Sequence, residues 1–183
     1  RLYPNIKIQT VESSSRSVED NVRSGAADIG IIPLFQASPE FSVRVLYQEE
    51  LLLVSSDELP CSRGVSRPWV DPEVLDGKDF ILMGEKSRIR KAVETVFLEH
   101  GVKPRSILDS SNNMTTYLVA TTGMALTVVP EATVRMMNPI RIPRVYSIGK
   151  SGFRWDIGAI WREDMVLSSA HQQLFKILKN CGI

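Results

Sequence analysis

Serines gather where the sequence predicts that a strand passes into a helix. Ser13, Ser14 and Ser15 follow a segment of alternating apolar and polar residues, 6–11, and precede an amphipathic segment, 15–24. At such a turn the first backbone N–H groups of the helix and the positive end of its dipole point outward, which suits an anion. Because no acid–base pair or activated nucleophile accompanies the serines, the pattern predicts a site that holds a small anionic molecule without transforming it.

Two further turns have the same composition. Residues 84–87 follow an apolar segment, 79–83, and precede a helical pattern at 88–100; residues 110–113 follow a shorter apolar segment, 106–108. Any single Ser or Asn at such a place is an ordinary helix N-cap. Three such turns, divided between two lobes that face each other, would bring their helix starts to one cleft.

Bulk properties indicate a globular domain. The 183 residues are 43% hydrophobic and 23% charged, and the net charge is +1, which argues against a strongly basic nucleic-acid surface in this segment. No apolar run approaches the roughly 20 residues of a membrane helix, and residues 1–4 lack signal-peptide character. The chain opens in mid-pattern without a Met, so we expect a fragment of a longer protein.

The residues that most often bind metals are scattered. Cys61 and Cys181 lie far apart and make no metal-ligand spacing with His100 or His171. We interpret the cysteines as reduced thiols. The sequence therefore predicts no metal site, no cofactor and no catalytic residue, and hence no enzyme.

Strands and helices are expected to alternate along the chain. Residues 28–32 read as a buried strand, and 41–47 and 50–54 as further extended segments, after which the composition becomes polar and rich in turns. A lobe boundary is expected there. The pattern then restarts and ends with an expected strand at 155–161 and a last helix.

Five segments, in order, resemble the effector-binding domain of LysR-type transcriptional regulators. Residues 1–8 resemble that family's "fRxxYPxvxl" opening, 25–31 its "GxlDlai" signature and 46–54 its "pLxxexlvlv" strand. Residues 84–90 are similar to its "gxxsxxR" helix start and 122–130 to "xGxGiallP", although only Gly123 of that last pair of glycines is present.

The resemblance implies an α/β, two-lobed fold like that of type 2 periplasmic binding proteins, each lobe a mixed sheet flanked by helices, with a ligand cleft between the lobes. Lobe I would comprise residues 1–56 and 155–183, and lobe II residues 57–154. It also implies that an N-terminal winged helix-turn-helix domain and a linker helix, absent from this segment, bind DNA. The whole protein would be a cytoplasmic bacterial regulator with no membrane partner, a homodimer through this domain and a homotetramer at full length.

The resemblance also implies which residues bind the small-molecule effector. In chain order they are Ser13, Ser14, Ser15, Pro33, Leu34, Ser55, Ser56, Ser87, Asn112, Asn113 and Thr116. Hydroxyls and amides there would bond a carboxylate, and Arg16, Lys86 or Arg88 would add a full charge. In the dimer, the helix at 15–24 would face the helix at 88–100 of the second copy, with Val22 and Ala92 near the contact.

Two other function classes stay open at this point. One is a stand-alone solute-binding protein of the same fold, which the residues preceding Arg1 would distinguish. The other is an enzyme, which needs an acid–base or nucleophile–base set that the sequence does not show. The sequence does not identify the effector.

Overall fold

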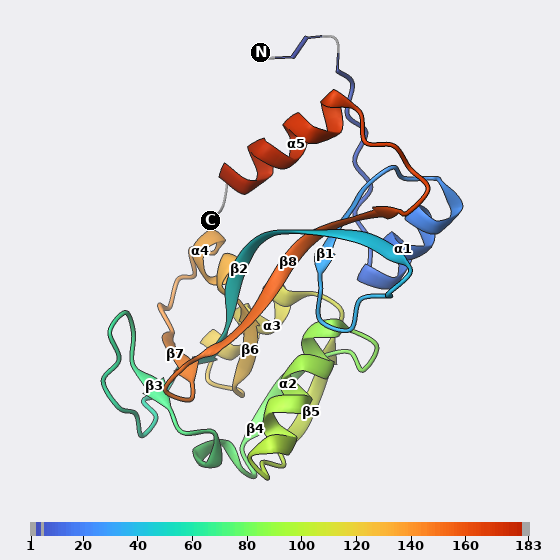
Figure 1. Ribbon diagram of the computed structural model, residues 1–183. Coiled ribbons are helices and arrows are strands. Elements are labelled where there is room, and N and C mark those ends of the chain that lie inside the picture. The colour runs from blue at the N-terminus through green and yellow to red at the C-terminus, as the bar shows by residue number, and fades with distance from the viewer. Residues whose placement is uncertain (1–2, 5, 181–183) are drawn as a thin grey trace. The chain divides into compact units, whose positions relative to one another are not determined.

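The computed structural model describes residues 3, 4 and 6–180 and divides the chain into two units (Figure 1). Unit 1 comprises residues 1–48 and 156–183, and unit 2 comprises residues 49–155. Two strands, β2 (Phe41–Ser55) and β8 (Phe153–Arg162), contribute residues to both units.

Unit 1 is a small sheet with a helix packed on each face. Strand β1 (Gly30–Pro33) pairs antiparallel with β8, which lies beside β2. Alternate residues point to opposite faces. Ile32 and Ile160 pack with Val22 of α1 (Ser15–Ser24), whereas Ala159 packs with Phe175 of α5 (Ser169–Asn180).

Helix α1 approaches β1 closely because Gly30 lacks a side chain. A Cβ at Gly30 would lie 2.6 Å from Val18 and 2.9 Å from Ile160. The helix begins at the N-cap Ser14 and ends at Gly25, whose φ of 78° suits glycine. Val18 and Val22, one helical turn apart, therefore both pack closely against β1.

Unit 2 contains the remaining strands. The second half of β2 pairs antiparallel with β6 (Thr127–Pro130) and β7 (Arg144–Ile148), and β7 pairs in parallel with β3 (Trp69–Val70). Strand β4 (Asp79–Met83) pairs in parallel with β5 (Arg105–Ser110), and an isolated parallel bridge joins β4 to Leu126, just before β6.

Three α-helices and one 3-10 helix complete unit 2. The 3-10 helix spans Pro72–Leu75, α2 spans Arg88–Glu99, α3 spans Asn113–Thr121 and α4 spans Glu131–Met136. Phe97 of α2 meets Phe80 of β4 edge to face, with ring centroids 5.4 Å apart. Helix α3 packs on β2 and β6 through a cluster that includes Val54 and Tyr117.

The predicted strand at 6–11 is wrong. These residues, all described, have no regular structure and are exposed. Amphipathic alternation stabilises a strand only where a neighbouring strand accepts and donates the backbone hydrogen bonds. No described strand pairs with this segment, so the alternating pattern is present without the sheet it requires.

Other differences concern which elements form and where the two units divide. The two extended segments expected at 41–47 and 50–54 form one continuous strand, β2. α4 and β7 were not predicted from the sequence. The sequence places the first crossing between lobes after residue 56, whereas the two units divide at 48/49, because residues 49–55 are buried among unit 2 strands.

Replacing Phe97 by Ala is expected to destabilise the chain by about 3–5 kcal/mol, since a buried aromatic side chain is lost and a cavity remains. Phe97 is 2% exposed. Val166 is 90% exposed, so Val166→Ala should change stability by less than about 0.5 kcal/mol. Urea unfolding of both variants measures the difference, and equal effects would contradict the packing described.

Candidate functional site

The start of α1 is an exposed helix N-terminus. The Oγ of Ser14 caps it by accepting the backbone N–H of Ser17 at 3.2 Å, and the hydroxyl of Ser13 donates to the Ser14 carbonyl at 3.4 Å. Helix geometry leaves the N–H groups of Ser15 and Arg16, in the first turn, without an acceptor in the helix. The side chain of Ser14 is thus committed to the cap, and the backbone N–H groups remain for an anion.

The end of β1 lies close to this helix start. Leu34, directly after Pro33, donates its N–H to the Asp156 carbonyl at 2.8 Å. Its side chain covers Gly158 and packs against the same buried cluster as Val18, one turn into α1. The end of β1 and the first turn of α1 therefore pack against one buried cluster of unit 1.

In unit 2, two helix starts share one edge of the β4–β5 pair. Ser87 caps α2 by accepting the N–H of Arg90 at 3.0 Å, and Asn112 caps α3 with two N–H bonds of 2.8 and 3.4 Å. The N–H of Gly84 donates to the Ser110 carbonyl at 2.8 Å, which joins the carboxyl ends of β4 and β5. Ser87 and Asn112 are thus brought to the same edge, as predicted from the repeated turns.

Arg90 positions this edge, and the sequence analysis missed it. Its guanidinium donates to the Met83 carbonyl at 3.2 Å, to Asp109 at 2.9 Å and to Glu94 at 2.5 Å. Burial disfavours its charge, but the bonds to Glu94 and Asp109 outweigh burial and raise the pKa of Arg90. Arg90 therefore ties α2 to the ends of both strands. The sequence held two signals for Arg90: its place three residues after an N-cap serine, and its match to the arginine of the family's "gxxsxxR" helix start.

Asn113 and Thr116 differ in what they offer a ligand. The buried Oδ1 of Asn113 has no hydrogen-bond partner among the described residues, so it is an acceptor that suits a donor group. Thr116 is 0% exposed, and its hydroxyl donates to the Asn113 carbonyl at 2.9 Å. Thr116 thus supports the first turn of α3 from inside unit 2.

Ser55 and Ser56 lie at the opposite edge of unit 2. Strand β2 is antiparallel to β6, and Val54 pairs with Thr127, at the start of β6, rather than with Pro130 at its end. Because β4 and β6 run parallel, their carboxyl ends share an edge that excludes these serines. Ser55 instead exchanges hydrogen bonds with the backbone of Asp57. The structure does not bring Ser55 and Ser56 together with Ser87 and Asn112.

A polar cavity of about 420 Å³ lies at that opposite edge. It is lined by residues from the end of β2, the end of α3 and the loop before β7, namely Ser56, Asp57, Thr121, Thr122, Gly123, Arg141 and Ile142. Of the predicted site residues it contains Ser56 alone.

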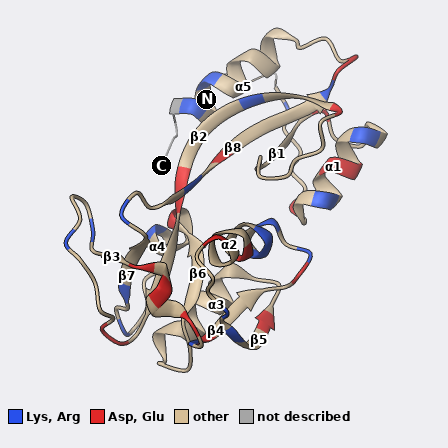
Figure 2. Cartoon of the chain, turned by 60° about the horizontal axis from the view of Figure 1, so that its bottom comes forward, with Lys and Arg blue, Asp and Glu red and all other residues tan. Residues whose placement is uncertain are grey.

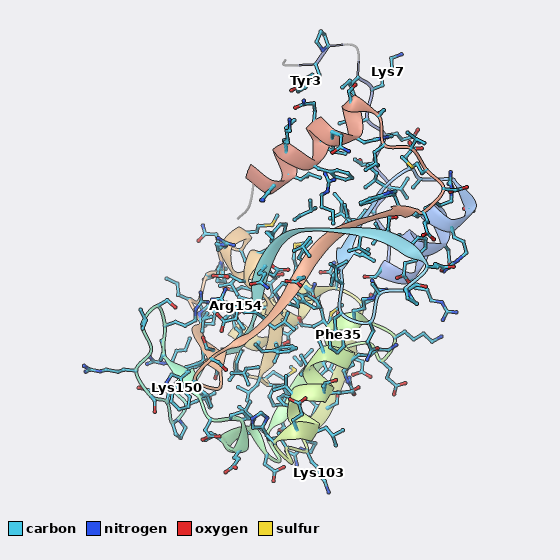
Figure 3. All side chains as sticks on the ribbon, in the orientation of Figure 1. Tyr3, Lys7, Phe35, Lys103, Lys150 and Arg154 are labelled. Carbon is cyan, nitrogen blue, oxygen red and sulfur yellow. The ribbon has the colours of Figure 1, made fainter. Side chains whose placement is uncertain are left out.

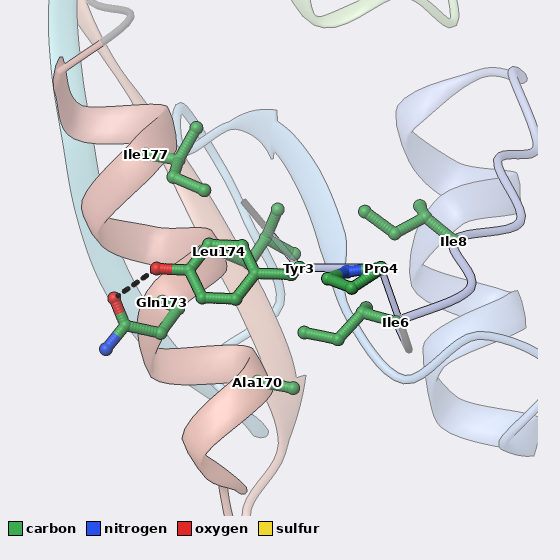
Figure 4. A pocket seen from close by; sticks show the side chains of 8 residues that line it. All are labelled: Tyr3, Pro4, Ile6, Ile8, Ala170, Gln173, Leu174 and Ile177. Atoms are coloured by element: carbon green, nitrogen blue, oxygen red, sulfur yellow. Dashed lines mark hydrogen bonds between the residues drawn. The ribbon is translucent and has the colours of Figure 1, made fainter. Parts of the chain in front are cut away.

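Unit 1 has an apolar cavity of about 490 Å³ between the first described residues and α5 (Figure 4). Its lining is mostly aliphatic, and the Tyr3 hydroxyl donates to Gln173 Oε1 at 3.3 Å. The residues that line it are Tyr3, Pro4, Ile6, Ile8, Ala170, Gln173, Leu174 and Ile177. None belongs to the predicted site, and none supplies a base or a nucleophile.

Within residues 3, 4 and 6–180, no group of three His, Cys, Asp or Glu side chains is arranged to hold a metal ion. Cys61 is exposed, and Cys181 lies outside the described residues. Among the described helices, none has the length and apolar character needed to cross a membrane.

The chain is similar to known proteins along almost its whole length. The family model described as "LysR substrate binding domain" matches residues 1–181. An uncharacterized HTH-type transcriptional regulator of Bacillus subtilis (strain 168), YwbI, is 26% identical over 168 residues, which are 92% of this chain and 54% of YwbI. The chain thus spans about half the length of this relative.

Solved structures share the fold. The CcmR regulatory domain of Synechocystis PCC6803, in complex with 2-PG, has a TM-score of 0.84 and 16% identity, over 98% of this chain and 85% of that chain. The effector-binding domain of QuiR, in complex with shikimate, has a TM-score of 0.72 and 15% identity, over 91% of this chain and 77% of that chain. These likenesses confirm the predicted α/β fold of the type 2 periplasmic-binding-protein kind.

The two serines before α1 are expected to differ in their contribution to stability. Ser14→Ala removes the N-cap bond and should cost about 1 kcal/mol of unfolding free energy. Ser13→Ala removes only the 3.4 Å bond to the Ser14 carbonyl and should change stability by less than about 0.5 kcal/mol. Urea unfolding of the two variants tests this; a larger loss in Ser13→Ala would show that the cap is assigned to the wrong residue.

Proposed function

The chain belongs to the LysR substrate-binding domain family, and we propose that the effector it binds is a small anionic metabolite, such as a carboxylate. The family match confirms the predicted effector-binding domain of a LysR-type regulator. The relatives are named as transcriptional regulators rather than enzymes, which agrees with the prediction that the domain catalyses no reaction.

One observation carries the proposal. Three helices, α1, α2 and α3, begin beside strand ends, and each cap side chain is bonded to its own helix. An incoming acceptor therefore meets exposed first-turn N–H groups and a positive helix end, an arrangement that favours negative charge. That CcmR and QuiR are in complex with 2-PG and shikimate supports a small organic ligand.

The proposed ligand-binding residues form one set in each unit. In unit 1 they are the start of α1 with Pro33 and Leu34; in unit 2 they are the starts of α2 and α3, including Asn113. Ser55 and Ser56 are left out because they lie at the other edge of unit 2. That one molecule contacts both sets stays a prediction from the family resemblance.

Binding is expected to depend on the helix starts. Ser15→Ala and Asn113→Ala should each weaken binding about tenfold, because each removes a hydrogen bond to a charged or donor-bearing ligand worth roughly 1.5 kcal/mol. Ser24→Ala, at the other end of α1, is the matched control and should leave affinity unchanged. Calorimetry with shikimate, with 2-PG and with a panel of small carboxylates measures the affinities.

Two results would contradict the proposed site. One is a bound ligand whose affinity falls with Ser24→Ala as much as with Ser15→Ala. The other is a panel in which only cationic or uncharged compounds bind. A stand-alone solute-binding protein is the less favoured alternative, since the relatives are HTH-type regulators.

For the whole protein we propose a cytoplasmic regulator whose DNA contacts are made by an N-terminal winged helix-turn-helix domain outside this chain. The relatives carry HTH-type names and are longer than the matched segment. Nothing in the charge of this segment, +1, provides a DNA-binding surface. A homodimer of this domain and a homotetramer of the whole protein are parts of the same proposal.

The proposed dimer contact between α1 and α2 needs different residues from those predicted. Val22 and Ala92 are both 0% exposed within their own units, because they point into the cores beneath these helices. Leu98, near the end of α2, is the exposed apolar side chain of that helix. We therefore propose that the contact through α2 includes Leu98.

Replacing Leu98 by Asp is expected to shift the domain toward monomer at micromolar concentration, since a charge would be buried in the contact. Sedimentation velocity across a concentration series measures the change. Lys103→Asp, a charge change in the loop after α2, is the control. A domain that is monomeric without substitution would contradict this arrangement.

A further inference from the structure

Two neighbouring carboxylates are buried at the start of unit 2. Glu49 is 5% exposed and Glu50 is 3% exposed, and both lie in β2 (Figure 2). Adjacent residues of a strand point to opposite faces, so the two side chains have separate surroundings. Burying a carboxylate costs several kcal/mol unless hydrogen bonds or charges compensate it, which makes both side chains candidates for a role beyond packing.

Glu49 joins two elements through its two oxygens. Oε1 accepts the indole N–H of Trp155, on β8, at 3.1 Å. Oε2 accepts the backbone N–H of Ala132, in the first turn of α4, at 3.3 Å. A carboxylate can accept both bonds at once because it carries no proton of its own.

Helix α4 has no side-chain cap of its own, unlike α2 and α3, so its first turn depends on the bond from Ala132 to Glu49. Its N-cap is Pro130, which supplies no side-chain hydrogen bond, and none of the residues of α4 is fully buried. A helix of six residues has little stability by itself. Glu49 therefore accepts a first-turn N–H of α4, as Ser87 accepts one of α2. Ser87 directly precedes its helix, whereas Glu49 lies on the distant strand β2.

The charges around Glu49 are few and identified. Glu131 and Arg135 both lie on α4: the charge of Glu131 raises the pKa of Glu49, and the charge of Arg135 lowers it. Glu131 is itself paired with Arg67 at 2.7 Å. On its own face of β2, Glu50 lies 3.7 Å from Arg154 of β8, labelled in Figure 3. Burial would raise the pKa of Glu131, but its hydrogen bond to Arg67 and the nearby arginines lower it.

We propose that Glu49 is a proton-sensitive clamp: ionised, it holds the first turn of α4 and the indole of Trp155 together, and it releases α4 when it takes up a proton. A protonated carboxyl presents a hydroxyl where one of the two N–H donors now points, so one bond is lost. Burial is the largest influence on Glu49 and raises its pKa above the ordinary value of 4.5, against the opposing effect of the two hydrogen bonds.

Release of the clamp is separate from unfolding. Because the folded carboxyl binds its proton at a higher pH than the unfolded one, this group adds stability as the pH falls through its folded pKa. The unit therefore stays folded while α4 loosens. Residues of α4 and α3 pack against one cluster, around Tyr117 and Ala120, so loosening α4 removes support from the helix that begins at Asn113. This last step rests on the proposed function; the clamp itself does not.

The indole N–H resonance of Trp155 reports on the clamp in the whole chain without any ligand. The chain has three tryptophans, so nitrogen–proton spectra contain three indole signals, and Trp155→Phe assigns the one of interest. In a pH titration the Trp155 signal should move in one step, with its midpoint above the ordinary glutamate value of 4.5, whereas Trp161, packed in unit 1, should stay constant. Below the midpoint the protection factor of the Ala132 amide, which is its intrinsic exchange rate at that pH divided by the observed rate, should fall several-fold.

Two variants test whether the step in the Trp155 signal comes from Glu49. Glu49→Gln should abolish the step, because the amide does not titrate, and Glu50→Gln, its neighbour on the opposite face, should leave it unchanged. If Glu49→Gln does not fold, carboxyl-carbon labelling of glutamate in the unsubstituted chain should show Glu49 titrating at the midpoint of the Trp155 step. A flat Trp155 signal, or an equal step in Glu49→Gln, would overturn the clamp.

Discussion

The interior of unit 2 depends on one strand segment, residues 49–55, which is hydrogen-bonded on both edges. β6 lies on one side and β7 on the other, and the apolar run Leu51–Val54 is fully buried. Each such side chain contributes about 1.5–3 kcal/mol when buried. Because the segment runs antiparallel to β6, its first residues reach the edge where α4 begins and its last residues reach the other edge. The same pairing therefore places Glu49 beside the start of α4 and places Ser55 and Ser56 at the opposite edge, away from the starts of α2 and α3.

The caps limit what side chains can do at the candidate site. Ser14, Ser87 and Asn112 were predicted to bind a ligand, and in the structure each has its oxygen bonded to N–H groups of its own helix. This favours recognition of a ligand by the backbone N–H groups, which bond any anion and so do not distinguish one anion from another. Discrimination between anions must come from groups outside the caps. We propose Asn113 as one such group, since its buried Oδ1 has no partner among the described residues.

Local patterns in the sequence predicted the elements that carry their own signals. Apolar spacing predicted helices at 15–24 and 88–100, and the structure has them at 15–24 and 88–99. Polar side chains before the helices predicted N-caps, which in the structure are Ser14, rather than the expected Ser15, and Ser87 and Asn112. The failures depend on other parts of the fold. Residues 6–11 alternate correctly but have no paired neighbour, and the edge reached by Ser55 is set by strand direction. Arg90 and Glu49 act through contacts distant in sequence, with Asp109 and Trp155, which spacing does not reveal.

Those two residues hold unit 2 in different ways. Arg90 donates to two carboxylates and a carbonyl, and its own charge does not titrate near neutral pH, so it ties the ends of β4 and β5 as a constant cation. Glu49 accepts only neutral donors, the indole of Trp155 and the N–H of Ala132, and among the described residues no ion pair holds its charge. Its ionisation therefore depends on the balance between burial and two hydrogen bonds. The start of α2 is held by a cation that does not titrate near neutral pH, whereas in our proposal the start of α4 is held only while Glu49 keeps its charge.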